Sequence, residues 1–372
     1  MSDAKYKSRI ASLLAEAGVV IDGDQPWDIR VHDERLYHRV WLNSSLGFGE
    51  AYMEGWWDCD RLDALFDRVL SGRLNEKVRG WADFWVHLRA CLTNMQSRRR
   101  AYDVGEQHYD LDNDLFERML DSRMTYSCGY WREAQDLENA QRDKLDLICR
   151  KLHLAPGMRL LDIGCGWGGL LQYAAANYGI EGVGVTISRE QAELARERCA
   201  DLPVEIRLTD YRELDERFDA IASVGMFEHV GEKNYDTFMD VACRCLQEDG
   251  LFLLHSIGQQ RTRMGGDPWL HKYIFPNGSL PSARRISESS EARFIMEDWH
   301  NFGPDYDRTL MAWHQNFEAN WEALQDRYDE RFHRMWRYYL CCCAGAFRSR
   351  ILQLWQVVFS RCHTHGVYRS VR

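Results

Sequence analysis

The stretch "LLDIGCGWGG", residues 160–169, decides how this chain is expected to fold. An apolar run precedes its glycines and the helical pattern "LLQYAAANYG" follows them, so the glycines lie at a turn between a strand and a helix. Their spacing fits two patterns: G-x-G-x-x-G, typical of dinucleotide-binding loops, and D-x-G-x-G-x-G, typical of proteins that bind S-adenosylmethionine. Either pattern predicts a cofactor site, and the residues around it must distinguish the two cofactors.

The segments on either side of this loop predict the fold class. From about residue 140, strand patterns alternate with helical patterns. Strands are predicted at "MRLLDIG", "EGVGVTI", "VEIRLTD", "FDAIASVG" and "GLFLLHSIG", and later at "RFIMEDWHNFG" and "ILQLWQVVFSR". This alternation predicts an α/β protein with a parallel sheet that helices cover on both faces. A helical and unusually aromatic region at 315–349 is inserted into this pattern.

Three polar positions favour S-adenosylmethionine as the cofactor. A dinucleotide site needs an acidic residue at the end of the second strand to bind the ribose, and Thr186 stands there. Asp162, in the first strand, can attract a methionine ammonium group but would repel a pyrophosphate. Asp210, which ends the third strand, can accept a hydrogen bond from an adenine amino group. We therefore predict a class I S-adenosylmethionine-dependent methyltransferase (Rossmann-like) fold with aromatic-rich insertions.

The residues before the alternating region predict a small additional domain. Residues 4–17 place apolar side chains on one helical face, "DIRVHD" and "YHRVWLN" have short β-like patterns, and a helical pattern continues to about residue 91. We predict an N-terminal domain at 1–95, a linker at 96–115 and a catalytic domain at 116–372. The aromatic residues Trp56, Trp57, Phe48 and Tyr52 either anchor this domain at a lipid interface or form its core, and we favour the core.

The composition is that of an ordinary globular protein. The 372 residues are 45% hydrophobic and 28% charged, and no apolar run has the length of a signal peptide or a membrane span, so we expect a cytoplasmic protein. The net charge of −10 argues against nucleic-acid binding, although basic patches such as "SRRR" leave contact with an anionic membrane surface open beside a simple solvated face. The 12 cysteines lack the C-x-x-C spacing of zinc or redox sites, so no metal centre is predicted and most should be reduced core residues.

Several long motifs outside the generic cofactor core resemble those of the cyclopropane-fatty-acyl-phospholipid synthases, within the mycolic-acid cyclopropane synthase superfamily. They are "SLGFGEAYMEGWWDCDRLD", "GEQHYDLDNDLF", "YSCGYW", "SVGMFEHVG", "FLLHSIG", "DPWLHKYIFPNGSLPS", "MEDWHNFGPDYDRTLMAW" and "CAGAFRSR". The resemblance covers essentially the whole chain. It implies that the π bond of a cis-unsaturated phospholipid acyl chain attacks the methyl group of S-adenosylmethionine, and that loss of a proton closes a cyclopropane ring. One departure is Asp112, which replaces the glycine of the family's "HYDLGNDLF".

The resemblance also implies the site residues. A bound bicarbonate is the implied base, and its ligands are Cys128, Glu228, His255, Tyr306 and the backbone of Ile257. The implied cofactor contacts are Tyr126, Ser127, Gly164, Gly166, Thr186, Gln191, Asp210 and Tyr211, and Asp162 joins them on the charge argument above.

The placement of two of these residues is independent support. Glu228 follows the fourth predicted strand and His255 ends the fifth, so both should lie at the carboxyl edge of the sheet, where open α/β folds bind ligands. A carbocation must be shielded from water and aromatic faces can stabilise it, and among the aromatic insertions we single out Tyr306. Cys343 lies in the "CAGAF" segment. The implied reaction has no step for a cysteine thiolate, so we predict that Cys343 only packs in the core. Whether bicarbonate or His255 itself takes the proton stays open.

The resemblance further implies a homodimer that associates peripherally with the inner face of the membrane, where the N-terminal domain assists access to lipid. Its partners would be membrane phospholipids with cis-unsaturated acyl chains. Two other functions remain to be weighed. A related enzyme could add a methyl group without closing a ring, and a protein of another class could bind cofactor and membrane without turnover.

Overall fold

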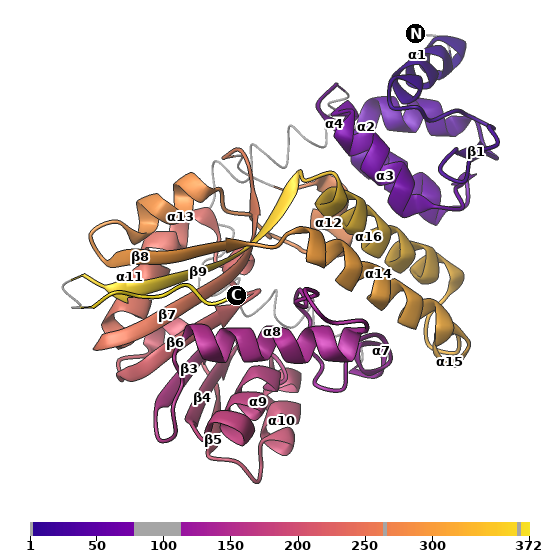
Figure 1. The fold of residues 1–372 in the computed structure, drawn as a ribbon. Helices are drawn as coiled ribbons and strands as arrows, with labels where there is room; N and C mark the ends of the chain where they lie inside the picture. The colour runs from indigo at the N-terminus through magenta and orange to yellow at the C-terminus, as the bar shows by residue number, and fades with distance from the viewer. Residues whose placement is uncertain (1–2, 78–112, 263–265, 363–365) are drawn as a thin grey trace. The chain divides into compact units, whose positions relative to one another are not determined.

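The structure, a computed structural model, describes residues 3–77, 113–262, 266–362 and 366–372 (Figure 1). The chain divides into two compact units. Unit 1 comprises Met1–Thr93, Arg263–Gly278 and Tyr306–Leu352, and unit 2 comprises Asn94–Thr262, Ser279–Asp305 and Gln353–Arg372. The sequence-based division assigned residues 263–278 and 306–352 to the catalytic domain, whereas their contacts group them with the N-terminal residues.

Unit 2 is built on a seven-stranded sheet with the strand order β5-β4-β3-β6-β7-β9-β8. Strands β3 to β7 pair in parallel where they adjoin, and β8 and β9 pair antiparallel. Their bounds are β3 Arg159–Ile163, β4 Glu181–Thr186, β5 Val204–Leu208, β6 Phe218–Val224, β7 Leu246–Gln259, β8 Phe294–Asn301 and β9 Leu352–Arg361. The order reverses at β3, whose neighbours β4 and β6 lie on opposite sides, and such a switch point is where open α/β sheets bind ligands.

Helices cover both faces of this sheet (Figure 1). One apolar core lies under helices α8, α9 and α10, with Leu145, Leu171 and Ala192 among its members, and a second lies under α11 and α13, with Phe238 and Ile286. The helices are α7 Asn113–Met119, α8 Leu137–Lys151, α9 Gly169–Tyr178, α10 Arg189–Arg198, α11 Tyr235–Cys245 and α13 Ala283–Ser290, with single turns at Tyr211–Glu213, Phe227–His229 and Glu232–Asn234. The predicted α/β class and all seven strands predicted from residue 158 onward are therefore confirmed.

Unit 1 is helical. Its elements are α1 Asp3–Glu16, α2 Arg35–Met53, α3 Leu62–Ser71, α4 Leu74–Lys77, α12 Pro268–Tyr273, α14 Pro304–Ala319, α15 Trp321–Leu324 and α16 Glu330–Arg348, with a two-stranded sheet of β1 Arg30–Val31 and β2 Trp57–Asp58. The β-like interpretation of "YHRVWLN" was wrong, because these residues lie inside α2. Buried Leu36 and Tyr37 begin the inward face of that helix, so tertiary packing outweighed a local alternation of polar and apolar residues.

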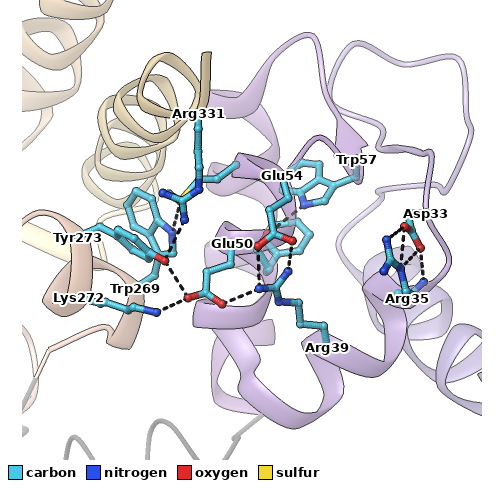
Figure 2. Close-up of polar contacts among 12 residues, drawn as sticks. Asp33, Arg35, Arg39, Glu50, Glu54, Trp57, Trp269, Lys272, Tyr273 and Arg331 are labelled. Carbon is cyan, nitrogen blue, oxygen red and sulfur yellow. Dashed lines mark hydrogen bonds and ion pairs between the residues drawn. The ribbon is translucent and has the colours of Figure 1, made fainter. Parts of the chain in front are cut away.

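Segments that are distant in sequence share the core of unit 1. The ring of Trp269, from α12, is buried and lies 4.4 Å from that of Tyr338, from α16. Glu50 of α2 accepts hydrogen bonds from Lys272 (2.6 Å) and from the hydroxyl of Tyr273 (2.9 Å) (Figure 2). The other carboxylate oxygen of Glu50 accepts a hydrogen bond from Arg39 (2.9 Å). Apolar contacts and ion pairs therefore join the α12 segment to the N-terminal helices.

The favoured core assignment of the N-terminal aromatics is confirmed for two of them. Trp57 and Tyr52 are 0% and 1% exposed, and the indole of Trp57 donates to the Phe48 carbonyl (3.0 Å) and stacks on the Phe48 ring. Trp56 is half-buried between the guanidinium groups of Arg35 and Arg39. These rings are engaged within unit 1.

Candidate functional site

Two of the predicted site residues, Asp162 and His255, are placed by strand register near the carboxyl edge of the sheet. Asp162 in β3 pairs in register with Gly184 of β4 and Ala222 of β6. His255 lies beside Val224, the last residue of β6, although β7 continues beyond it to Gln259. The prediction that His255 ends its strand was therefore wrong, because β7 continues for four residues beyond it, but His255 lies level with the end of β6.

The glycine loop has the backbone shape that the motif requires. Gly164 has φ +87°, and a Cβ there would overlap the Met226 side chain at 2.6 Å, so any larger residue would be excluded. Gly166 also has a positive φ, +53°, but apart from its two chain neighbours no atom of the described residues lies within 4 Å of its would-be Cβ. Open space beside a glycine at the start of a helix fits a cofactor that approaches the backbone closely.

The ribose-side and adenine-side residues are positioned by short polar contacts. The hydroxyl of Thr186 donates to Gln191 Oε1 (3.1 Å), so the pair predicted from "TISREQ" is adjacent. Asp210 accepts from the backbone and guanidinium of Arg212, at 2.9 and 2.5 Å. Tyr211 packs its ring on Phe238, and burial raises the pKa of its phenol to about 12. The Asp210 carboxylate is thus held by a partner that leaves it further acceptor positions.

The segment Tyr126 to Cys128 is held by helix α8. The amide of Gln141 donates to the Ser127 carbonyl (2.8 Å), and Lys144 Nζ donates to Ser127 Oγ (2.8 Å). Both side chains are 0% exposed. Cys128 is also fully buried, and its thiol donates to the Gly129 carbonyl at 3.1 Å. Two buried polar anchors therefore fix the backbone that carries three predicted site residues.

Asp162 is a buried carboxyl group with an unmet bonding capacity. Its side chain is 3% exposed, and Oδ1 has no hydrogen-bond partner among the described residues. Burial raises its pKa to about 7, and the nearby positive charge of Lys144 only partly opposes this rise. Buried polar atoms are nearly always hydrogen-bonded, so Oδ1 is suited to a cationic ligand group such as a methionine ammonium.

Glu228 is a second buried carboxyl group of this kind. Oε1 accepts the Ile257 amide hydrogen at 2.6 Å, while Oε2 has no partner among residues that the structure describes. Burial raises the pKa of Glu228 to about 7. The Ile257 amide, predicted to bind bicarbonate, thus binds Glu228 here, and its contact with an anion stays a prediction. At neutral pH the carboxyl group can either hold or give up a proton.

His255 completes the group. The ring is 1% exposed, Nδ1 lies 3.2 Å from the amide nitrogen of Gln356, and Nε2 has no partner in the described part of the chain. Burial, followed by the charges of Lys144 and Lys151, holds the pKa of His255 well below its usual value, so the ring is neutral. His229, which follows Glu228 in the sequence, is also neutral, because burial lowers its pKa to about 4.

Other predicted residues fall elsewhere. Tyr306 belongs to unit 1, where its ring lies 4.5 Å from that of Phe347 and 6.0 Å from that of Trp313, so its role at bicarbonate stays a prediction. Asp112 lies outside the described residues. Cys343 is buried in α16, as its assignment to packing requires. None of the eleven cysteines in the described ranges forms a disulfide bond, and eight of them are buried.

Sequence reasoning missed three buried polar residues next to the site: Gln141, Lys144 and Gln356. A signal was present for each. Gln141 and Lys144 occupy the inward face of α8, three or four residues from apolar neighbours, and Gln356 interrupts the apolar strand "ILQLWQVVF". Polar residues at core positions are uncommon and normally have a specific partner.

Two kinds of feature are absent from the described residues. Over the ranges that the structure describes, no helix has the length and apolarity needed to cross a membrane. Within the same ranges, no three histidine, cysteine, aspartate or glutamate side chains form a group that could hold a metal ion.

Comparisons with known proteins identify the family and the fold. The family model for mycolic acid cyclopropane synthetase matches residues 96–357. A solved structure, mycolic acid cyclopropane synthase CmaA1 complexed with SAH and CTAB, superposes with a TM-score of 0.65 and is 33% identical, covering 70% of this chain and 98% of that chain. The fold is that of S-adenosylmethionine-dependent methyltransferases, as the sequence predicted.

Two full-length relatives extend the match beyond the family model. Cyclopropane-fatty-acyl-phospholipid synthase of Escherichia coli strain K12 is 57% identical over 361 residues, which cover 96% of this chain and 94% of that protein. A probable fatty acid methyltransferase of Pseudomonas putida is 38% identical over 357 residues, which cover 91% and 88%. Both alignments include most of the N-terminal residues that the family model leaves out.

Proposed function

The chain belongs to the mycolic acid cyclopropane synthetase family, and from this membership we propose that it is an S-adenosylmethionine-dependent enzyme that forms cyclopropane rings on cis-unsaturated phospholipid acyl chains. The observation that carries the proposal is the group of buried polar atoms at the sheet edge: Asp162 Oδ1, Glu228 Oε2 and His255 Nε2 have no partners among the described residues. Groups of this kind occur where a protein holds a ligand.

The cofactor side of the site follows from the first of these atoms. The Asp162 carboxylate binds the methionine ammonium group, and the open glycine loop at Gly166 receives the nucleoside part. When bound, S-adenosylmethionine supplies an electrophilic methyl group. The π electrons of the acyl double bond form a bond to that carbon while the sulfur keeps the electrons of the broken C–S bond. Loss of a proton then leaves the C–H electrons to close the ring.

The acid–base side follows from the other two atoms. Bicarbonate, when bound, supplies a weak and poorly nucleophilic base. Glu228 in its protonated form can donate from Oε2 to such an anion, and neutral His255 can donate from Nε2. The buried ammonium of Lys144 lies close enough to act on Cys128, Asp162 and His255, so its charge also favours an anion there. Cys128, Tyr306 and Ile257 remain proposed ligands.

The proposed setting is a membrane surface. A phospholipid substrate resides in a bilayer, so we propose that the protein acts at the inner face of the membrane as a homodimer, with the residues of segment 1–95 assisting access to the acyl chain. The exposed side chains of Lys5 and Arg9, one helical turn apart on α1, support this proposal, because each basic group near an anionic leaflet contributes on the order of 1 kcal/mol. Lys7 contributes less, because its ammonium forms an ion pair with Glu34 (2.7 Å).

Mass spectrometry of lipids tests the proposed reaction. The full chain is incubated with S-adenosylmethionine and vesicles of cis-monounsaturated phospholipid, and the product is then treated by mild catalytic hydrogenation. We expect acyl chains heavier by one CH2 that take up no hydrogen, because a cyclopropane has no double bond. A heavier chain that still takes up hydrogen would identify a methyl-adding enzyme, the activity named for the Pseudomonas putida relative. Cofactor binding without any heavier lipid would refute both.

A second measurement addresses the base. Turnover is followed in buffer depleted of carbon dioxide and again after bicarbonate is restored. We expect loss and recovery of activity, with cofactor affinity unchanged. Undiminished turnover in depleted buffer would exclude bicarbonate as the base and would indicate that a side chain of this site removes the proton.

A further inference from the structure

A fully buried glutamine, Gln356, lies beside Nδ1 of His255, the ring nitrogen that does not face the proposed ligand. Gln356 belongs to β9, which adjoins β7 in the sheet, and its side chain is 0% exposed. Its amide nitrogen lies 3.2 Å from His255 Nδ1, and its oxygen has no partner among the described residues. The amide therefore has the histidine ring as its one identified polar neighbour in the described part of the structure.

The other surroundings of the ring limit its protonation. Lys144 and Lys151 are the charged groups that act on His255, and both come from the buried face of α8 with 0% exposure. Phe302 packs its ring against the imidazole at 5.9 Å between centroids. Two cations and an apolar contact disfavour an imidazolium, so the ring carries a single proton. In a neutral imidazole one nitrogen donates and the other accepts, and the partner of one nitrogen sets the role of the other.

We propose that Gln356 is a positioning residue that donates its amide hydrogen to His255 Nδ1 and thereby places the ring proton on Nε2. This inference rests on the proposed function, because it assigns His255 a role at the same site. With the proton on Nε2, His255 is a hydrogen-bond donor toward the bound ligand. It is not the group that removes the proton from the substrate, and that role falls to the anion.

The opposite arrangement makes a different prediction. If the Gln356 amide were turned around, its oxygen would accept from Nδ1–H, and Nε2 would present a lone pair to the site as a base. The two arrangements have the same shape and the same burial, and they differ only in the location of one proton. A spectroscopic measurement of that proton therefore decides between them.

The test is nitrogen NMR of the full chain labelled with ¹⁵N-histidine, with the His255→Asn variant used to assign the signal. We expect His255 to be neutral at pH 7 with the proton on Nε2 and a bare Nδ1. A proton on Nδ1 would overturn the proposal. In Gln356→Glu the carboxylate can only accept, so we expect the proton to move to Nδ1 and an imidazolium to appear in the accessible pH range. If this variant does not fold, the wild-type spectrum alone still decides.

Activity measurements add a matched control on the same strand. Gln356→Met removes the donor. Gln353→Met removes a second buried glutamine of β9, whose oxygen accepts a hydrogen bond from Asn301 (2.7 Å) and which lies three positions away, where the alternation of a strand places it on the other face of the sheet. We expect turnover to fall about 10- to 100-fold in Gln356→Met with cofactor affinity retained, whereas Gln353→Met keeps the wild-type rate. Equal losses in both variants would indicate a structural role only.

The outcomes for the inference and for the proposed function are separable. A proton on Nε2 in a protein that modifies no lipid would leave the inference standing and refute the proposed function. Ring formation together with a proton on Nδ1 would do the reverse.

Discussion

Buried carboxyl groups behave oppositely in the two units. Asp63 in unit 1 and Asp162 in unit 2 are equally hidden, at 2% and 3% exposed. Burial opposes the ionisation of Asp63, but hydrogen bonds from Arg61 (2.9 Å) and Arg348 (2.8 Å) outweigh it and lower its pKa to about 2. Asp162 accepts no such bond at Oδ1, and its pKa rises to about 7.

This difference distinguishes a structural charge from a functional one. In unit 1 the carboxylate joins α3 to α16, and Arg348 continues to Asp307 of α14, so the charge is compensated within the fold. In unit 2 the charge of the Asp162 carboxylate would be compensated by a bound ligand. Leaving a buried polar group unpaired costs free energy, and proteins accept that cost mainly at binding and catalytic sites.

The largest expected effect tests the functional side of this comparison. Glu228→Met removes the donor that the proposal assigns to Oε2, and we expect turnover to fall by about 100- to 1,000-fold. Glu228→Gln is the matched control, because its amide can still accept from Ile257 and donate to an anion, so most of the turnover should persist. Lipid mass spectrometry measures the rate, and isothermal titration with S-adenosylhomocysteine provides the control for an intact cofactor site. Wild-type turnover in Glu228→Met would mean that the unpaired carboxyl group is incidental.

The structural side is tested by Arg348→Met. Loss of its hydrogen bonds to Asp63 and Asp307 should lower the free energy of unfolding by about 1.5–3 kcal/mol, as measured by urea denaturation. Arg284→Met is the control, because Arg284 and Glu288 form an exposed pair whose loss should cost less than about 1 kcal/mol. Similar losses in both variants would contradict a special role for the buried cluster.

The same cluster predicts an acid sensitivity. Asp63 has a depressed pKa in the folded protein, so its stabilising contribution is full above the unfolded value of about 4 and is lost as the pH falls toward 2. In Arg348→Met this part of the decline should be smaller. An unchanged pH profile of stability would show that Arg61 alone holds the carboxylate ionised.

The close approach of α3 and α16 can be tested without changing any charge. A Cβ at Gly345 would lie 2.6 Å from Phe66 Cβ and 2.7 Å from the Asp67 nitrogen, and the second of these atoms belongs to the backbone. Gly345→Ala should therefore lower the free energy of unfolding by about 1–3 kcal/mol. Gly266→Ala is the control, because it adds the same methyl group at a glycine of unit 1 without positive φ, where the atom nearest to the new Cβ, the Gly278 carbonyl oxygen, lies 3.6 Å away. A neutral Gly345→Ala would mean that the two helices can separate at no cost.

The smallest expected effect concerns cofactor affinity and pH. The ionised form of Asp162 binds an ammonium group, and the pKa of the Asp162 carboxyl group in the protein without ligand is about 7. Affinity for S-adenosylhomocysteine should therefore reach its limit about one unit above pH 7 and fall by up to about tenfold per unit below pH 7. Titration calorimetry between pH 5.5 and 7.5 measures this change. Asp162→Asn should bind more weakly with a flatter profile, and a slope equal to the wild type would assign the dependence to another group.

Much of unit 2 was accessible from the sequence by itself. Alternating strand and helix patterns, the glycine loop and the polar residues after successive strands predicted the sheet and the edge where Asp162, Glu228 and His255 lie. This was possible because parallel strands connected by helices present their carboxyl ends at one edge, so positions in the sequence translate directly into positions at the site.

Tertiary structure alone decided the remaining features. The core of unit 1 is formed by helices from three separated segments, and no local pattern indicates that Trp269 and Tyr338 pack together. The same holds for Gln356, whose strand follows His255 by about a hundred residues and yet supplies the neighbour of its ring. Local sequence determines periodicity and turn geometry, whereas the pairing of distant polar groups depends on packing that only the folded chain defines.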